Sequence, residues 1–169
     1  WSATDYGSVA HEILEKFGLS DEARDLRGRS EIADWMNESL TLLVADRFGS
    51  KPAAAIRIQA DSLRERLGWF AETQAGLRDE GWRIERVEAA FSLDVEGMQI
   101  LGSIDRIDYN EESGKRRVLD YKTSAKATGI AKAHLTKITA STAWPEHLVG
   151  VDEVVTEIPS GRAKNSKLV

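Results

Sequence analysis

The chain has 169 residues, of which 41% are hydrophobic and 30% are charged, and it contains no cysteine. This composition fits one compact globular domain over residues 1–169 and excludes a disordered or fibrous segment. Without cysteine there are no disulfides, thiolate zinc sites or cysteine-ligated iron–sulfur clusters, so a bound metal needs oxygen or imidazole ligands. The net charge of −5 argues against a protein that coats nucleic acid nonspecifically.

The sequence also bears on location and completeness. No apolar run approaches the roughly 20 residues that span a bilayer, and no basic stretch followed by an apolar one opens the chain. We therefore expect a cytoplasmic protein that does not bind membranes. Because Trp1 stands where an initiator methionine would, we expect a single catalytic domain that is a fragment of a longer chain.

Three helices are predicted for the first half. Over Gly7–Phe17, apolar residues recur with a period of 3.6, which indicates an amphipathic helix. Ser30 can cap a second helix that extends to Phe48. Pro52 suits the first turn of a third helix, which extends to about Asp79.

The second half predicts strands. After Gly81 the apolar period changes to about two, and the alternation over Val87–Leu93 is typical of a half-buried strand. Turn residues separate it from a second strand at Met98–Tyr109 and a third at Arg116–Thr123, which gives an antiparallel meander. A further strand or edge segment is expected within Leu148–Ile158. Helices followed by such a sheet indicate an α/β fold with α+β character.

Two carboxylates are predicted to face each other across the second hairpin. If the hairpin turns symmetrically about Asn110–Lys115, paired residue numbers sum to 225, as 110 and 115 do, and Asp105 lies opposite Asp120. Side chains in such pairs have Cβ atoms about 4.5–5.5 Å apart, and like charges there destabilise a sheet. A hard divalent cation would relieve the repulsion by taking oxygen ligands from both carboxylates.

Neighbouring charged residues allow two interpretations. Asp120 and Lys122 share one strand face, where the lysine could stabilise charge developing on a phosphate, although a surface ion pair is the plainer explanation of this triplet alone. On the second strand, Arg106 and Asp108 project from the side opposite to Asp105, and we interpret them as ordinary solvated charges.

The segments Gly102–Asp108 and Val118–Thr123 resemble the catalytic core of RecB-like nucleases in the PD-(D/E)xK superfamily. Upstream, Gly7–Glu15 looks like the amino-terminal helix motif of that family, in which a glycine precedes a metal-binding histidine. The resemblance implies a restriction-endonuclease-like core, in which helices flank a mixed sheet that contains an antiparallel meander.

Carried onto matching positions, the resemblance implies a metal site and a catalytic lysine. The implied ligands of Mg²⁺ or Mn²⁺ are His11, Asp105, Asp120 and the backbone carbonyl of Tyr121. The implied catalytic lysine is Lys122. Glu88 lies in a stretch that also looks family-like and is treated as accessory, although its position on the polar face makes a solvated strand glutamate the plainer explanation. By itself, His11 would more often be a packed or surface histidine than a metal ligand.

Two departures from the family pattern are visible. Ile104 replaces the nominal proline before Asp105, and no glutamine follows Lys122, where family members have a helix with a Gln-x-x-x-Tyr pattern. The second departure leaves a catalytically inactive, nuclease-like module for binding nucleic acid or another subunit as the alternative function.

The expected function is metal-dependent hydrolysis of DNA phosphodiester bonds, as an exonuclease in recombination or repair. Helicase or other nuclease-complex domains or subunits are the expected partners besides DNA, because no phosphate-binding Gly-x-x-x-x-Gly-Lys-Ser/Thr loop is present here. Glycoside hydrolysis by the paired carboxylates is a further alternative, but it would give no role to His11 or Lys122.

Overall fold

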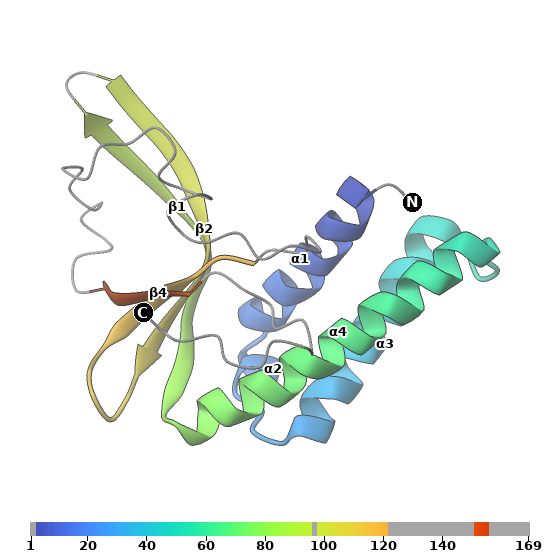
Figure 1. The fold of residues 1–169 in the computed structure, drawn as a ribbon, viewed down its shortest axis with the longest axis horizontal. Helices are drawn as coiled ribbons and strands as arrows, with labels where there is room; N and C mark the ends of the chain where they lie inside the picture. The colour runs from blue at the N-terminus through green and yellow to red at the C-terminus, as the bar shows by residue number, and fades with distance from the viewer. Residues whose placement is uncertain (1–2, 96–97, 122–150, 156–169) are drawn as a thin grey trace. The chain divides into compact units, whose positions relative to one another are not determined.

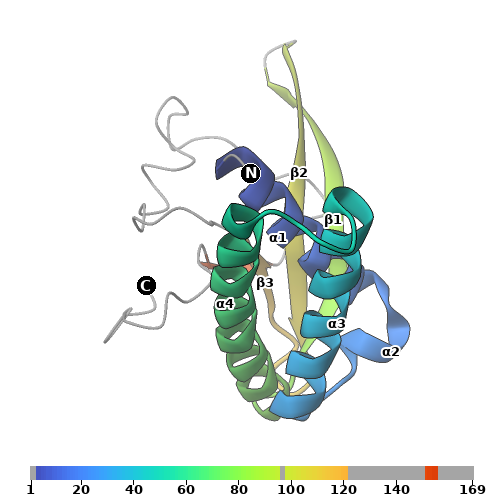
Figure 2. The ribbon, with the colours of Figure 1, turned by 90° about the vertical axis from the view of Figure 1, so that its right-hand side faces the viewer.

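A computed structural model describes residues 3–95, 98–121 and 151–155 of the chain. The chain divides into two compact units, a helical unit that ends at Gly81 and a sheet unit that starts at Trp82. Figures 1 and 2 show the helices and strands in two views. Within the described residues, no helix combines the length and the apolar character that crossing a membrane requires.

Three long helices and one short one make up the helical unit: α1 (Ala3–Leu19), α2 (Asp21–Arg24), α3 (Arg29–Phe48) and α4 (Ala54–Asp79). The three long helices confirm the predicted ones. The single turn of α2 was not predicted, although the Ser20 hydroxyl caps it by accepting a hydrogen bond from the backbone N–H of Ala23 at 3.1 Å.

The predicted starts of the second and third helices were wrong in detail. Helix α3 begins one residue before Ser30, with Gly28 at the N-cap, and the Glu31 carboxylate accepts the Gly28 N–H at 3.3 Å. The Glu31 carboxylate therefore caps this helix, in place of the predicted Ser30 side chain. Pro52 precedes α4 instead of lying in its first turn, since Ala53 is the N-cap.

Aromatic contacts join the three long helices. The Phe17 ring of α1 meets Trp35 of α3 and Phe70 of α4 edge to face, with centroid distances of 5.4 and 5.7 Å. The predicted apolar stripe of α1 is buried throughout, and it comprises Val9, Ala10, Ile13, Leu14 and Phe17. Helices α3 and α4 run alongside each other (Figure 2).

The sheet unit contains four strands in the order β1-β2-β3-β4, which are β1 (Trp82–Val95), β2 (Met98–Asn110), β3 (Arg116–Leu119) and β4 (Val151–Val155). The first three form the predicted antiparallel meander, and β4 pairs with β3 in parallel. The mixed sheet is therefore confirmed, as is a strand within Leu148–Ile158.

The β2–β3 hairpin has the predicted register. Its pairs run from Tyr109↔Arg116 to Arg106↔Leu119, and in each pair the residue numbers sum to 225. The Asn110 side chain shapes the turn, because its Oδ1 atom accepts the backbone N–H groups of Glu112 and Ser113 at 3.1 and 2.7 Å. This register brings the residue after β3 level with Asp105.

Candidate active site

Asp105 lies on β2 across from Glu88 on β1. The pairs Val87↔Arg106 and Ala89↔Ile104 are regular on either side, so Glu88 and Asp105 occupy the position between them. One ligand oxygen from each carboxylate lies within 4.8 Å of the other. Two acidic groups from neighbouring strands therefore share one small region of the sheet.

The backbone of β1 is distorted at this position. Glu88 has φ 45°, and it is the non-glycine residue with a positive φ in the described part of the chain. Such a conformation costs about 1–3 kcal/mol and persists only where the surroundings impose it. A register shift between Ile84 and Arg86 adds a second irregularity three residues earlier. Bulges and strained residues concentrate where a strand must redirect a functional side chain.

A hydroxyl group holds the exposed Glu88 carboxylate. Its Oε2 atom accepts a hydrogen bond from Ser103 Oγ at 2.9 Å. Ser103 is on β2, two residues before Asp105, so the partner strand orients this glutamate. Glu88 is solvent-exposed, as the plainer interpretation of the sequence had it, but it is also brought to Asp105.

Asp105 is tied to the chain just beyond β3. Its Oδ2 atom accepts the backbone N–H of Tyr121 at 2.6 Å. The β2–β3 pairing ends at Arg106↔Leu119, one position before the predicted Asp105–Asp120 pair. Asp120 itself is half-buried and adjoins Tyr121. The structure thus brings together Glu88, Asp105 and the backbone of Tyr121, and the continued register places Asp120 level with Asp105.

Two predicted site residues remain, His11 and Lys122. His11 is half-buried on α1, in the helical unit. Lys122 lies outside the described residues.

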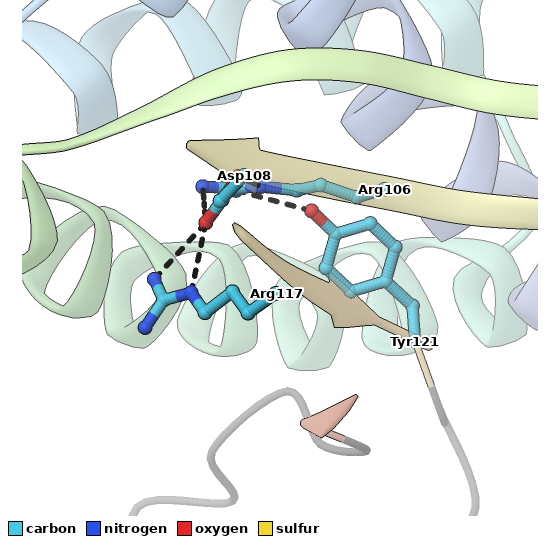
Figure 3. A network of polar contacts seen from close by, with 4 residues as sticks. All are labelled: Arg106, Asp108, Arg117 and Tyr121. Carbon is cyan, nitrogen blue, oxygen red and sulfur yellow. Dashed lines mark hydrogen bonds and ion pairs between the residues drawn. The ribbon is translucent and has the colours of Figure 1, made fainter. Parts of the chain in front are cut away.

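The interpretation of Arg106 and Asp108 as solvated charges was wrong. Arg106 is 1% exposed and Asp108 is fully buried. Two hydrogen bonds join them, from Nε to Oδ1 at 2.5 Å and from a terminal nitrogen to Oδ2 at 2.9 Å (Figure 3). Because such charges cannot remain in an apolar interior unpaired, each explains the burial of the other.

Two further side chains complete this buried network. Arg117 of β3 donates to Asp108 Oδ2 from Nε at 3.2 Å and from a terminal nitrogen at 3.0 Å. Its guanidinium carbon lies 4.1 Å from the centre of the Trp82 ring. On the other side, Arg106 donates to the Tyr121 hydroxyl at 3.2 Å, as Figure 3 shows.

Burial and neighbouring charges shift the pKa values of Tyr121 and Arg106 in this network. Burial raises the pKa of the Tyr121 phenol above its ordinary value, and the nearby Arg106 charge only partly opposes it. For Arg106, burial alone would lower the pKa, but the Asp108 carboxylate and the Tyr121 phenol together raise the pKa above its usual range. The guanidinium therefore stays charged and the phenol stays neutral at physiological pH.

The sequence contained a signal for part of this network. The register that predicted Asp105 opposite Asp120 also places Asp108 opposite Arg117, and the structure has that pair. A buried aspartate facing an arginine could therefore have been inferred from the same hairpin. The link from Tyr121 to Arg106 left no comparable signal, because it joins positions that do not pair.

Comparison with known families gives a match over most of the chain. A family profile described as the PD-(D/E)XK nuclease superfamily matches residues 2–140. The match includes part of each unit and every predicted site residue. A search of the curated proteins found no match. Nucleases of this superfamily use divalent metals, and the paired carboxylates are suitable donors for such ions.

Proposed function

This chain belongs to the PD-(D/E)XK nuclease superfamily, and we propose that it is a divalent-metal-dependent deoxyribonuclease. Its mixed α/β fold is consistent with the restriction-endonuclease-like fold of that superfamily. The facing carboxylates of Glu88 and Asp105 are the observation that carries the proposal. Two like charges held close together on facing strands repel each other, and a hard cation between them would turn that repulsion into attraction.

The donor set fits Mg²⁺ or Mn²⁺. A chain without cysteine has no thiolate to offer, and carboxylates are the preferred ligands of both ions. We propose Asp105 and Asp120 as ligands, together with His11 and the carbonyl of Tyr121, on the strength of the resemblance to RecB-like nucleases. Glu88 joins them because of its approach to Asp105.

When bound, the cation would supply Lewis-acid stabilisation of a phosphate and a lower pKa for water. The residues of the chain supply the rest. Asp105, held by the Tyr121 N–H, presents a carboxylate of fixed orientation. Lys122, by resemblance, places an ammonium group at the scissile phosphate, where it stabilises the developing negative charge.

The type of nuclease and its cellular role are proposed from the resemblance of the motifs around His11, Asp105 and Lys122 to those of RecB-like nucleases. We propose an exonuclease that acts on DNA in recombination or repair, together with a helicase or with other subunits of a nuclease complex. An acidic chain is consistent with partners that supply part of the grip on DNA, because its net charge of −5 gives no basic footprint.

The experiment uses the full-length protein with linear and with closed circular DNA, in Mg²⁺, in Mn²⁺ and in a chelator. Metal-dependent loss of the linear DNA alone is expected of an exonuclease. Asp105→Asn and Lys122→Ala should each reduce kcat by at least about 100-fold. Asp94→Asn, which makes the same charge change at an exposed position of β1, should cleave normally. Cleavage at the wild-type rate by Asp105→Asn would overturn the assignment of the site.

A binding module that does not cut is the second candidate, and the absence of glutamine after Lys122 favours it. Calorimetric titration with Mn²⁺ separates the two. The nuclease should bind the ion, and Asp105→Ala should weaken that binding. A protein that binds DNA while showing neither Mn²⁺ binding nor cleavage would be a binding module.

A further inference from the structure

Tyr121 connects the candidate metal site to the buried ion network. Its backbone N–H donates to Asp105 Oδ2 at 2.6 Å, and its phenol oxygen accepts from Arg106 at 3.2 Å. The residue is nearly buried, and its bond to Arg106 forms in a poorly hydrated setting, where hydrogen bonds are strong, while its bond to Asp105 is partly buried. One residue therefore touches a proposed ligand with its backbone and the network with its side chain.

The network itself is rigidly held. Asp108 receives two hydrogen bonds from Arg106 and two from Arg117. Arg117 is further fixed against the Trp82 ring. Paired and buried guanidinium groups have few alternative positions, because any displacement would leave a charge without its partner. Arg106 is thus a fixed donor for the Tyr121 phenol.

We infer that Tyr121 is a positioning residue for the metal site, anchored through its phenol by Arg106 so that its N–H orients the Asp105 carboxylate. This inference rests on the proposed function. The segment after β3 has no regular strand pairing at Tyr121, so the phenol anchor replaces the sheet as the restraint on this backbone. The same anchor restrains the preceding residue, Asp120, which is a proposed ligand.

Removal of the phenol hydroxyl tests the inference. Tyr121→Phe keeps the ring and the backbone but loses the bond to Arg106. Calorimetry with Mn²⁺ alone should show binding about 10–100-fold weaker, as is typical when a group behind a metal ligand is lost. Tyr109→Phe, which removes a hydroxyl from the same sheet, should bind Mn²⁺ as the wild type does.

A purely structural role for Tyr121 must be separated from positioning. Arg117→Lys weakens the network at Asp108 without touching the Arg106–Tyr121 bond, so it should lower the free energy of unfolding and leave Mn²⁺ affinity within about threefold of wild type. Each titration is made well below the unfolding temperature of the variant. If Tyr121→Phe is destabilised but binds Mn²⁺ normally, the positioning role is wrong.

Hydrogen exchange in the wild-type protein gives a test that does not depend on the folding of a variant. Saturating Mn²⁺ should slow exchange of the Tyr121 amide hydrogen, because a ligated Asp105 holds its acceptor oxygen still. Unchanged exchange would contradict the inference. A wild-type protein that binds no Mn²⁺ would instead refute the proposed function, so the two failures can be told apart.

Discussion

Glu88 of β1 stands across from Asp105 of β2, between the regular pairs Val87↔Arg106 and Ala89↔Ile104. Its backbone adopts φ 45° at this position, and its carboxylate lies within 4.8 Å of that of Asp105. Strain and like-charge repulsion therefore coincide at a single point of the sheet. An acidic pair maintained in spite of both costs is better explained by a bound cation than by folding.

The first prediction concerns this repulsion. Glu88→Gln keeps the shape of the side chain and removes its charge, so the metal-free protein should become slightly more stable while Mn²⁺ binding becomes at least about tenfold weaker. Thermal unfolding in a chelator and calorimetry with Mn²⁺ provide the two measurements. Glu112→Gln, in the exposed turn after β2, should change neither. A less stable metal-free Glu88→Gln protein would argue that this carboxylate serves the fold.

The sequence predicted this site in part. Strand alternation and the symmetry of the turn were sufficient to align Asp105 with Asp120, because the period and the register of a hairpin are local properties. The kink at Glu88 could not be predicted in this way. Positive φ is signalled by glycine or asparagine, and a glutamate adopts it only when contacts from another strand impose it.

The buried charges escaped prediction for a different reason. Alternation shows that Arg106 and Asp108 share a face, but not whether that face is covered. A charged face was therefore interpreted as exposed, which is the usual case for arginine and aspartate. Only the pairing of Asp108 with two arginines makes the burial tolerable, and one of those arginines comes from the next strand.

The second prediction follows from that burial. Asp108→Asn leaves two buried guanidinium groups without their counter-charge, and this should lower the free energy of unfolding by about 3–5 kcal/mol. Urea denaturation measures the loss. Glu111→Gln breaks the exposed Arg83–Glu111 ion pair, and its effect should stay below about 1 kcal/mol. Similar losses for the two variants would mean that the buried network contributes no more than a surface pair.

The third prediction is a pH dependence that arises from Glu85 and Arg116. Two hydrogen bonds of 2.8 and 3.0 Å from the Arg116 guanidinium hold the pKa of Glu85 below its ordinary value and outweigh the opposing effect of burial. Since the pKa is lower in the folded than in the unfolded chain, the pair stabilises the fold above about pH 4.3. That contribution is lost as the pH falls through the lowered pKa.

Glu85→Gln tests this dependence directly. At pH 7 the variant should be less stable than the wild type by up to about 1 kcal/mol, because the pair is partly exposed. The difference should shrink as the pH is lowered below about 4 and should disappear once the wild-type carboxyl is protonated. Urea denaturation at a series of pH values measures it, and a difference that does not depend on pH would exclude the ion pair as its origin.

The fourth prediction concerns the close approach of β1 and β2 at Gly102, which pairs with Phe91. A methyl group at this glycine would lie 2.5 Å from two carbons of the Phe91 ring. That ring packs against the buried cluster of Ile104, Ile107 and Val118, so displacing it disturbs the core beneath the site. Gly102→Ala should therefore cost about 1–3 kcal/mol of unfolding free energy. Phe91→Leu makes room for the methyl group. The double variant should therefore lose less unfolding free energy than the sum of the two single losses, and the difference should be at least about 0.5 kcal/mol. Strictly additive losses in urea denaturation would show that the ring does not restrict this position.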